Sequence, residues 1–280
     1  MIFALGNVLA VAFNNVWAGA AARRLPVYLV LVLASPVALG VSLIAMLVFP
    51  SPWASEGAII GFVAGVVGGF GLLAGYRALA IGPIGSVTAI FASTATILLT
   101  MAGLFASPHM SWMTLLVVGL CVVAIFLVTR DERPAEIRLP ALVLGIAGGT
   151  GAGLFVLLMS FTSESDGFTP VVAVRVGVLV VAIAAILVGR RPLVRGELSQ
   201  APARYWISAC GAGVMDGLAN LFLLAAIRSL DLVTVAIIGA TTPAVTALIS
   251  WILLSEKLRS SQRLGLAIAV GAVVLHRVGA

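Results

Sequence analysis

The chemistry of this chain must come from a few charged and polar residues that lie inside long apolar stretches. Asp216, in the segment GVMDGLAN, falls near the middle of the apolar stretch 205–227. If this stretch spans a membrane, its charge costs about 2.5–3.5 kcal/mol on insertion scales, so a carboxylate without a use is not expected there. As a helix, the stretch places Gly213, Gly217 and Asn220 on the same face as Asp216. Three uses of the carboxylate stay open: binding a cationic group of a substrate, carrying a coupling proton, or forming an ion pair.

Arg175 is the obvious partner for such an ion pair. It lies about seven residues into the apolar stretch 168–189, and at about 1.5 Å per residue the two side chains reach similar depths in neighbouring helices. The arginine could instead hold an anionic or carboxylate substrate, or extend toward the membrane interface. A buried carboxyl group is more easily neutralised, which makes Asp216 the candidate for proton coupling.

Neutral polar and aromatic residues supply the remaining candidates for a substrate cavity. They are Asn14, Trp17, Tyr76, Ser93, Thr96, Asn220 and Thr241. Amides and hydroxyls in membrane helices either line a cavity or form hydrogen bonds between helices. Pro243 follows Thr241 and Thr242 and frees a carbonyl in mid-helix, which needs a partner or a cavity. The aromatic rings could stack on an aromatic or cationic substrate, although Tyr76 beside Arg77 also suits an interfacial anchor.

The sequence offers no pattern typical of an enzyme, a metal site or a bound cofactor. His109 and His276 form no HExxH motif, and no GxSxG segment or nucleotide-binding loop is present. Cys121 and Cys210 have neither metal-ligand nor redox spacing. We therefore expect a protein that is not an enzyme and needs no metal or cofactor.

Composition indicates that the polar residues are held by membrane helices. The chain of 280 residues is 62% hydrophobic and only 9% charged, against about 25% charged in soluble domains. Its 30 glycines suit close helix packing in lipid. Two glycine series repeat every four residues, Gly61, Gly65 and Gly69 in one stretch and Gly145, Gly149 and Gly153 in another. The arginines lie between apolar runs, so the net charge of +6 indicates no nucleic-acid partner, and we expect no cleavable signal peptide.

Ten apolar runs are long enough to cross a bilayer as helices, which need about 20 residues each. They cover residues 2–20, 27–49, 57–80, 83–106, 111–128, 140–161, 168–189, 205–228, 231–254 and 262–278. The runs divide as five and five: a first repeat at 1–130, a connecting loop at 131–138 and a second repeat at 139–280. An odd number of helices in each half gives the halves opposite orientation, so we predict an all-α integral membrane protein of two inverted five-helix repeats.

Two segments carry a resemblance to a known family. The first, LLAAIRSLDLVTVAIIGATTPAVTALISWILLSEKLRSSQRLGLAIAVGAVVL, contains Pro243, Glu256, Leu258, Gly265 and Gly271 at the places of the family pattern. The second, YRALAIGPIGSVTAIFASTATILLTMAG, is its counterpart in the first half; the following FASPHMSW lacks the family's acidic loop residue. The chain resembles the EamA-type members of the drug/metabolite transporter superfamily. This resemblance implies a ten-helix carrier with a central cavity and alternating access, but no particular substrate.

The expected function is therefore secondary transport of a small metabolite, amino acid or drug-like compound, most simply export, with Asp216 as the candidate for proton coupling. A carrier or flippase for a lipid-linked or sugar metabolite is the alternative, followed by a passive channel. The expected partners are a small-molecule substrate and the lipid bilayer, with a monomer or homodimer in a cell membrane, such as the bacterial inner membrane. Loop charge places both termini outside the cell, whereas the family resemblance implies termini inside.

Overall fold

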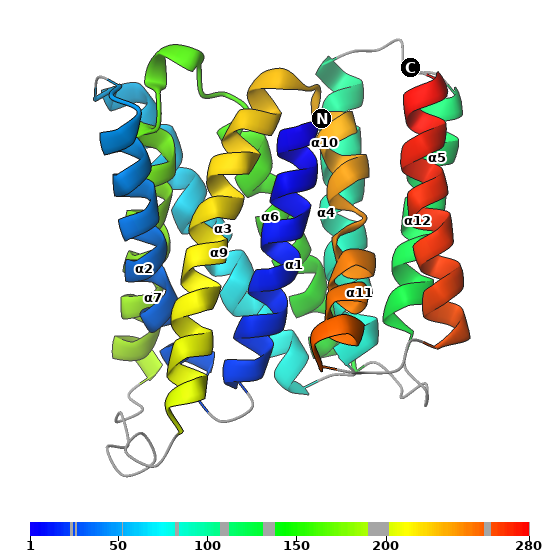
Figure 1. The fold of residues 1–280 in the computed structure, drawn as a ribbon, viewed down its shortest axis with the longest axis horizontal. Helices are drawn as coiled ribbons and strands as arrows, with labels where there is room; N and C mark the ends of the chain where they lie inside the picture. The colour runs from blue at the N-terminus through cyan, green and yellow to red at the C-terminus, as the bar shows by residue number, and fades with distance from the viewer. Residues whose placement is uncertain are drawn as a thin grey trace.

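The computed structural model describes residues 1–22, 25, 27–51, 53–81, 84–106, 112–130, 138–189, 202–254 and 259–279. Within these ranges the chain forms a bundle of long helices that stand side by side (Figure 1). Both termini lie at the same end of the bundle, as an even number of crossings requires. The loops that carry Arg23, Arg24, Arg133, Arg190, Arg191, Arg195 and Lys257 lie outside the described residues, as do Glu256 and His109.

The predicted segments form helices with closely similar bounds. They are α1 (Ile2–Ala22), α2 (Val27–Val48), α3 (Ser55–Ile81), α4 (Ile84–Ala106), α5 (Trp112–Thr129), α6 (Leu139–Met159), α7 (Thr169–Gly189), α9 (Ala203–Ser229), α10 (Leu232–Gly239), α11 (Thr242–Leu254) and α12 (Ser260–Gly279). Among the described residues, nine segments are long and apolar enough to cross a membrane, with α10 and α11 together forming one. The helix α12 forms as predicted, but Arg263, His276 and Arg277 make it more polar than the others. The all-helical fold class is confirmed.

The helix neighbours reveal the inverted repeat. One half converts into the other when each helix is exchanged for its counterpart: α1 for α6, α2 for α7, α3 for α9, α4 for α10 with α11, and α5 for α12. Under this exchange the contact of α1 with α9 becomes that of α6 with α3, and α2 with α9 becomes α7 with α3. The pairs α2 with α7 and α5 with α12 map onto themselves, and they stand at opposite edges of the bundle (Figure 1). The fold is therefore two related halves of opposite orientation.

The two predicted glycine series are contact ridges. A side chain at Gly61 or Gly65 of α3 would overlap the backbone of Pro170 or Val174 of α7, and one at Gly69 would press tightly against the side chain of Val181. The series Gly145, Gly149 and Gly153 of α6 lies in the same way against α4. Without a hydrophobic force between helices in lipid, such close approach is what holds them together.

At the end of the bundle that carries the termini, Arg228 ties α9 to the connection between α6 and α7. Its Nη2 donates to the carbonyl of Ser163 at 2.6 Å and to that of Gly167 at 2.9 Å. Between these carbonyls the short turn η1 (Glu164–Asp166) is closed by Asp166, which accepts from the Ser163 amide at 2.7 Å. The connection between these two helices is thereby fixed to the end of α9.

Asp231 caps the N-terminus of α10, and its contribution to the stability of the fold can be tested. It accepts from the amide of Thr234 at 2.9 Å and from its hydroxyl at 2.7 Å. Partial burial acts to raise the pKa of Asp231, but hydrogen bonds from Thr234 and nearby backbone amides outweigh it and lower the pKa below its ordinary value. The cap therefore stabilises the fold at neutral pH, and this stability is lost as the pH falls through the lowered pKa.

We expect Asp231→Ala to cost about 1 kcal/mol of folding free energy. Asp231→Asn should cost less, because its amide oxygen still accepts from the backbone. The check is detergent unfolding at neutral and acidic pH. The difference between wild type and Asp231→Ala should shrink in acid, and a difference that grows in acid would contradict the assigned sign.

Candidate functional site

The centre of the candidate site is an ion pair between α7 and α9, which is one of the three uses of Asp216 that the sequence left open. Arg175 Nη1 donates to Asp216 Oδ2 at 2.5 Å, and Nη2 donates to the backbone carbonyl of Asp216 at 2.8 Å. The side chain of Arg175 is 3% exposed and that of Asp216 is 33% exposed. A buried guanidinium requires such a counter-charge, because an unpaired charge in this environment is strongly destabilising.

Asp216 faces the interior of the bundle, although a third of its side chain is exposed. Ile207, which is 70% exposed, marks the side of α9 that meets lipid. It precedes Asp216 by nine residues, which is about half a turn away at 3.6 residues per turn. Asp216 therefore lies on the side of α9 opposite Ile207, which agrees with the expectation that this polar face points into the bundle.

Gly213 and Gly217 bring α9 close to α2. A side chain at Gly213 would meet Ala34 and Val37, and one at Gly217 would meet Val41 and Ala38. These glycines leave α2 as the wall beside the ion pair. The predicted face of α9 therefore serves two purposes. Its glycines pack against α2, and its polar residues lie around Arg175.

Asn220 completes the polar cluster. Its Nδ2 donates to the carbonyl of Asp216 at 3.0 Å. This contact determines the orientation of the amide, because its oxygen would repel a carbonyl. Asn220 Oδ1 therefore points elsewhere, and it is buried without a hydrogen-bond partner, as is Arg175 Nε. The cluster contains one unpartnered donor and one unpartnered acceptor.

A second interior feature is the break between α10 and α11. Pro243 has no N–H to donate to the carbonyl of Gly239, so that carbonyl loses its helical partner. A side chain added at Gly239 would find open space within 4 Å. Thr241, by contrast, donates its hydroxyl to Ile238 at 2.6 Å and is buried. The prediction that Pro243 interrupts this helix is confirmed, and sequence reasoning missed Gly239, four residues before that proline.

The hydroxyl groups of α4 are packed rather than open to a cavity. Thr96 donates to the carbonyl of Ala92 at 2.9 Å, and Thr100 donates to that of Thr96 at 2.8 Å. Ser93 is buried, and its hydroxyl oxygen has no partner. In this conformation Ser93, Thr96 and Thr100 are buried in the bundle. The predicted role of Ser93 and Thr96 in binding substrate stays a prediction.

The candidates on α1 divide between packing and polar contact. Trp17 lies against Gly211 of α9 and has Phe13 beside it, with ring centroids 6.2 Å apart. Asn14 is half-buried, whereas its neighbour Asn15 is exposed and donates to the hydroxyl of Thr246 on α11 at 3.3 Å. The side chain of Tyr76 lies outside the part of the chain that the structure describes. Trp17 therefore lies at the contact of α1 with α9, whereas Arg175 lies on a different helix, α7.

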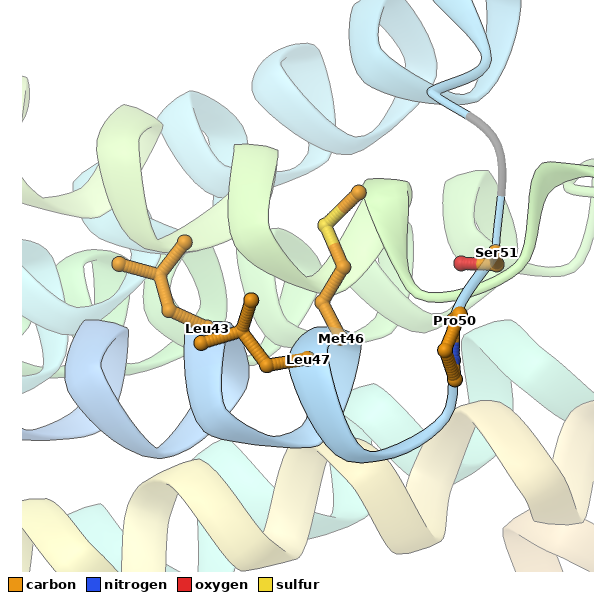
Figure 2. A pocket seen from close by; sticks show the side chains of 5 residues that line it. All are labelled: Leu43, Met46, Leu47, Pro50 and Ser51. Atoms are coloured by element: carbon orange, nitrogen blue, oxygen red, sulfur yellow. The ribbon is translucent and has the colours of Figure 1, made fainter.

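A separate apolar pocket of about 480 Å³ lies at the C-terminal end of α2. It is lined by Leu43, Met46, Leu47, Pro50 and Ser51. Figure 2 shows Leu43 and Leu47 side by side on the helix, with Pro50 and Ser51 in the chain that follows it. Leu43 and Leu47 are also exposed on the surface. This lining contains none of the predicted substrate-binding residues.

Among the described residues no three His, Cys, Asp or Glu side chains gather closely enough to hold a metal ion. The chemistry of the interior is that of one charge pair, amides, hydroxyls and a released carbonyl.

The two inverted halves, the interior charge pair and the broken helix define a multi-pass helical membrane protein with the architecture of a secondary transporter. The model of the EamA-like transporter family matches residues 139–277, and the chain belongs to this family within the drug/metabolite transporter superfamily. The search of curated proteins found no match. A solved structure described only as the crystal structure of a protein is 15% identical, with a TM-score of 0.78 over 98% of this chain and 95% of that one. That likeness concerns the fold alone.

Proposed function

We propose that this membrane transporter moves a small metabolite, amino acid or drug-like compound by alternating access, as an exporter in the bacterial inner membrane. The observation that carries the proposal is the ion pair of Arg175 and Asp216, in which the Arg175 side chain is 3% exposed and the Asp216 side chain is 33% exposed. Charged groups at this depth mark substrate or proton paths. The substrate would reach Asp216 and Asn220 when the two halves rock, with Asn14, Ser93 and Thr241 on the helices around it.

Proton coupling at Asp216 is the second part of the proposal. The Asp216 side chain is 33% exposed, so a proton can reach its carboxylate. Since no nucleotide-binding loop is found in the sequence, a gradient would supply the energy.

Vesicles that contain the purified protein provide the test. Metabolites that raise its melting temperature are tried first as substrates, and a pH gradient drives their transport. Asp216→Asn should abolish this transport or remove its dependence on the gradient, because the amide cannot exchange a proton. The matched control is Asp231→Asn, which removes a carboxylate from a helix cap and should transport like wild type. Unchanged transport and pH dependence in Asp216→Asn would reject the coupling role.

A carrier or flippase for a lipid-linked or sugar metabolite is the second candidate. It is favoured by the apolar pocket at the end of α2, where Leu43 and Leu47 meet the surrounding surface. An acyl or prenyl chain could rest there while its head group enters the bundle. Leu47→Glu should then reduce transport of a lipid-linked compound and leave that of a water-soluble one unchanged.

A further inference from the structure

Two buried polar atoms beside the ion pair have no hydrogen-bond partner. Arg175 Nε is a donor and Asn220 Oδ1 is an acceptor, and both are buried. Other nitrogens of the same side chains donate to one shared oxygen, the carbonyl of Asp216, at 2.8 and 3.0 Å. The two unpartnered atoms are therefore close enough for one small molecule to contact both. A buried group left without a partner is destabilising, and a ligand that pairs with it removes that cost.

The two atoms require complementary groups on that ligand. The Nε–H of a guanidinium pairs best with an anionic oxygen, and its fork geometry matches a carboxylate. The amide oxygen of Asn220 requires an N–H or O–H donor. A carboxylate with a hydroxyl or ammonium group on the adjacent carbon supplies both within one small head group.

Charge balance then links such a ligand to a proton. If a ligand carboxylate pairs with Arg175, two anions face one buried cation, and the excess charge is costly in this environment. One proton on Asp216 restores the original balance. The exposed third of the Asp216 side chain allows the proton to arrive, whereas Arg175 is almost fully enclosed.

The other charged or titratable groups on the helices around the pair lie too far along those helices to supply the balancing charge in place of this proton. The helices packed against α7 and α9 carry Tyr28 on α2, Glu56, Tyr76 and Arg77 on α3, Arg204, Tyr205, Cys210 and Arg228 on α9 itself, and Asp231 at the start of α10. Arg204 and Arg228 are each twelve residues from Asp216, about 18 Å along the helix. Gly65 lies beside Val174, so Glu56 is displaced from Arg175 by about nine residues, or about 14 Å, along α3. Gly213 and Gly217 meet α2 at residues 34–41, several residues beyond Tyr28. The described parts of α1 and α7 add only the terminal amine of Met1 and Arg175 itself.

We propose that the Arg175–Asp216–Asn220 cluster binds a small monocarboxylate with an adjacent hydroxyl group, together with one proton on Asp216. An adjacent ammonium group would itself balance the ligand carboxylate, so a ligand of that kind needs no proton. This proposal rests on the transport function proposed above and names its substrate class. On binding, an O–H bond forms between an incoming proton and the Asp216 carboxylate. The contact of Arg175 with Asp216 gives way to a contact with the ligand carboxylate. One anion and one proton enter, so the net charge of the site is unchanged.

Calorimetry on the purified full-length protein tests the proposal with four probes: lactate, alanine, propionate and ethylammonium. Titrations near pH 7 in buffers of different ionisation enthalpy report the protons taken up for each ligand bound. We expect lactate to bind with uptake of about one proton, by the charge balance of a buried pair. Alanine carries its own ammonium charge and should bind without proton uptake. Propionate lacks the donor for Asn220 and should bind about tenfold more weakly, the equivalent of one hydrogen bond. Ethylammonium should not bind.

Two variants separate the parts of the site. Asp216→Asn should bind lactate without proton uptake, because the amide is already neutral. Asn220→Leu should bind lactate only as tightly as propionate, with proton uptake retained. Melting curves confirm that each variant is folded.

Zero proton uptake when lactate binds to the wild type, equal uptake in Asp216→Asn, or binding of ethylammonium in place of the carboxylates would overturn the proposal. Failure of all four probes to bind would overturn it too, since its two contacts require only the groups that lactate and alanine carry. Vesicle transport of another metabolite in that case would leave the proposed function standing.

Discussion

Replacing Asp216 with leucine should cost about 3–5 kcal/mol of folding free energy, because Arg175 is left as an unpaired buried cation. In the wild type this guanidinium is 3% exposed, and it bonds to both the carboxylate and the backbone carbonyl of Asp216. The backbone contact survives the substitution but supplies no counter-charge. The expected loss is a large part of the stability of a typical domain. Unfolding in detergent, followed by circular dichroism, measures it.

The control is the double variant Arg175→Met with Asp216→Leu. Replacing both charges with apolar side chains of similar volume is often neutral or stabilising, so the double variant should recover most of the lost stability. A double variant as unstable as Asp216→Leu alone, or a single variant within about 0.5 kcal/mol of wild type, would contradict the assigned ion pair.

Substituting Gly65 with alanine should be the most damaging small change in the contact of α3 with α7. Its new Cβ would overlap the backbone carbonyl of Val174, which cannot move without shifting α7. Overpacking of this kind costs about 1–3 kcal/mol and sometimes more. Because Val174 precedes Arg175, the shift would also displace the ion pair.

Gly119 of α5 provides the matched control. A side chain at Gly119 meets nothing within 4 Å, so Gly119→Ala should be neutral, or stabilising by up to about 1 kcal/mol through helix propensity. Thermal melting of the two variants in the same detergent compares them. Equal melting temperatures would show that the ridge on α3 is not a close contact.

The helices could be predicted from the sequence because the signal for them is local. A run of about 20 apolar residues has few alternatives in lipid, and the ends of α1, α5 and α7 fall near the ends of their apolar runs. The interruption at Pro243 was also predictable, since a proline removes a donor wherever it lies. The extent of α12 is clear from its apolar centre, although its charged ends make it less apolar than the other helices.

The site could be predicted only in part, because its contacts join helices far apart in the sequence. Asp216 and Arg175 stand out as charges in apolar surroundings, which made their pairing predictable. The unpartnered atoms of Asn220 and Arg175 could not be predicted, since they depend on what every neighbouring side chain leaves unfilled. Similarly, Thr96 and Trp17 are polar or aromatic in sequence but serve contacts with their own or an adjacent helix.

The side of the membrane on which the termini lie stays a prediction. Most of the basic residues that determine it by the positive-inside rule lie in loops outside the described residues. A tag at the C-terminus, tested for accessibility in intact cells, distinguishes the outside location favoured by loop charge from the inside location implied by the family resemblance.

Counterflow in vesicles tests most directly the claim that the bundle is an alternating-access carrier. Vesicles are loaded with an excess of the unlabelled substrate, and entry of a trace of labelled substrate is followed without any ion gradient. A carrier should accumulate label transiently above its external concentration, because each outward step with unlabelled substrate leaves the site facing outside, where it picks up label. The control variant Asp231→Asn should behave identically. Label that only equilibrates, with a rate unaffected by internal substrate, would contradict the account and indicate a passive channel.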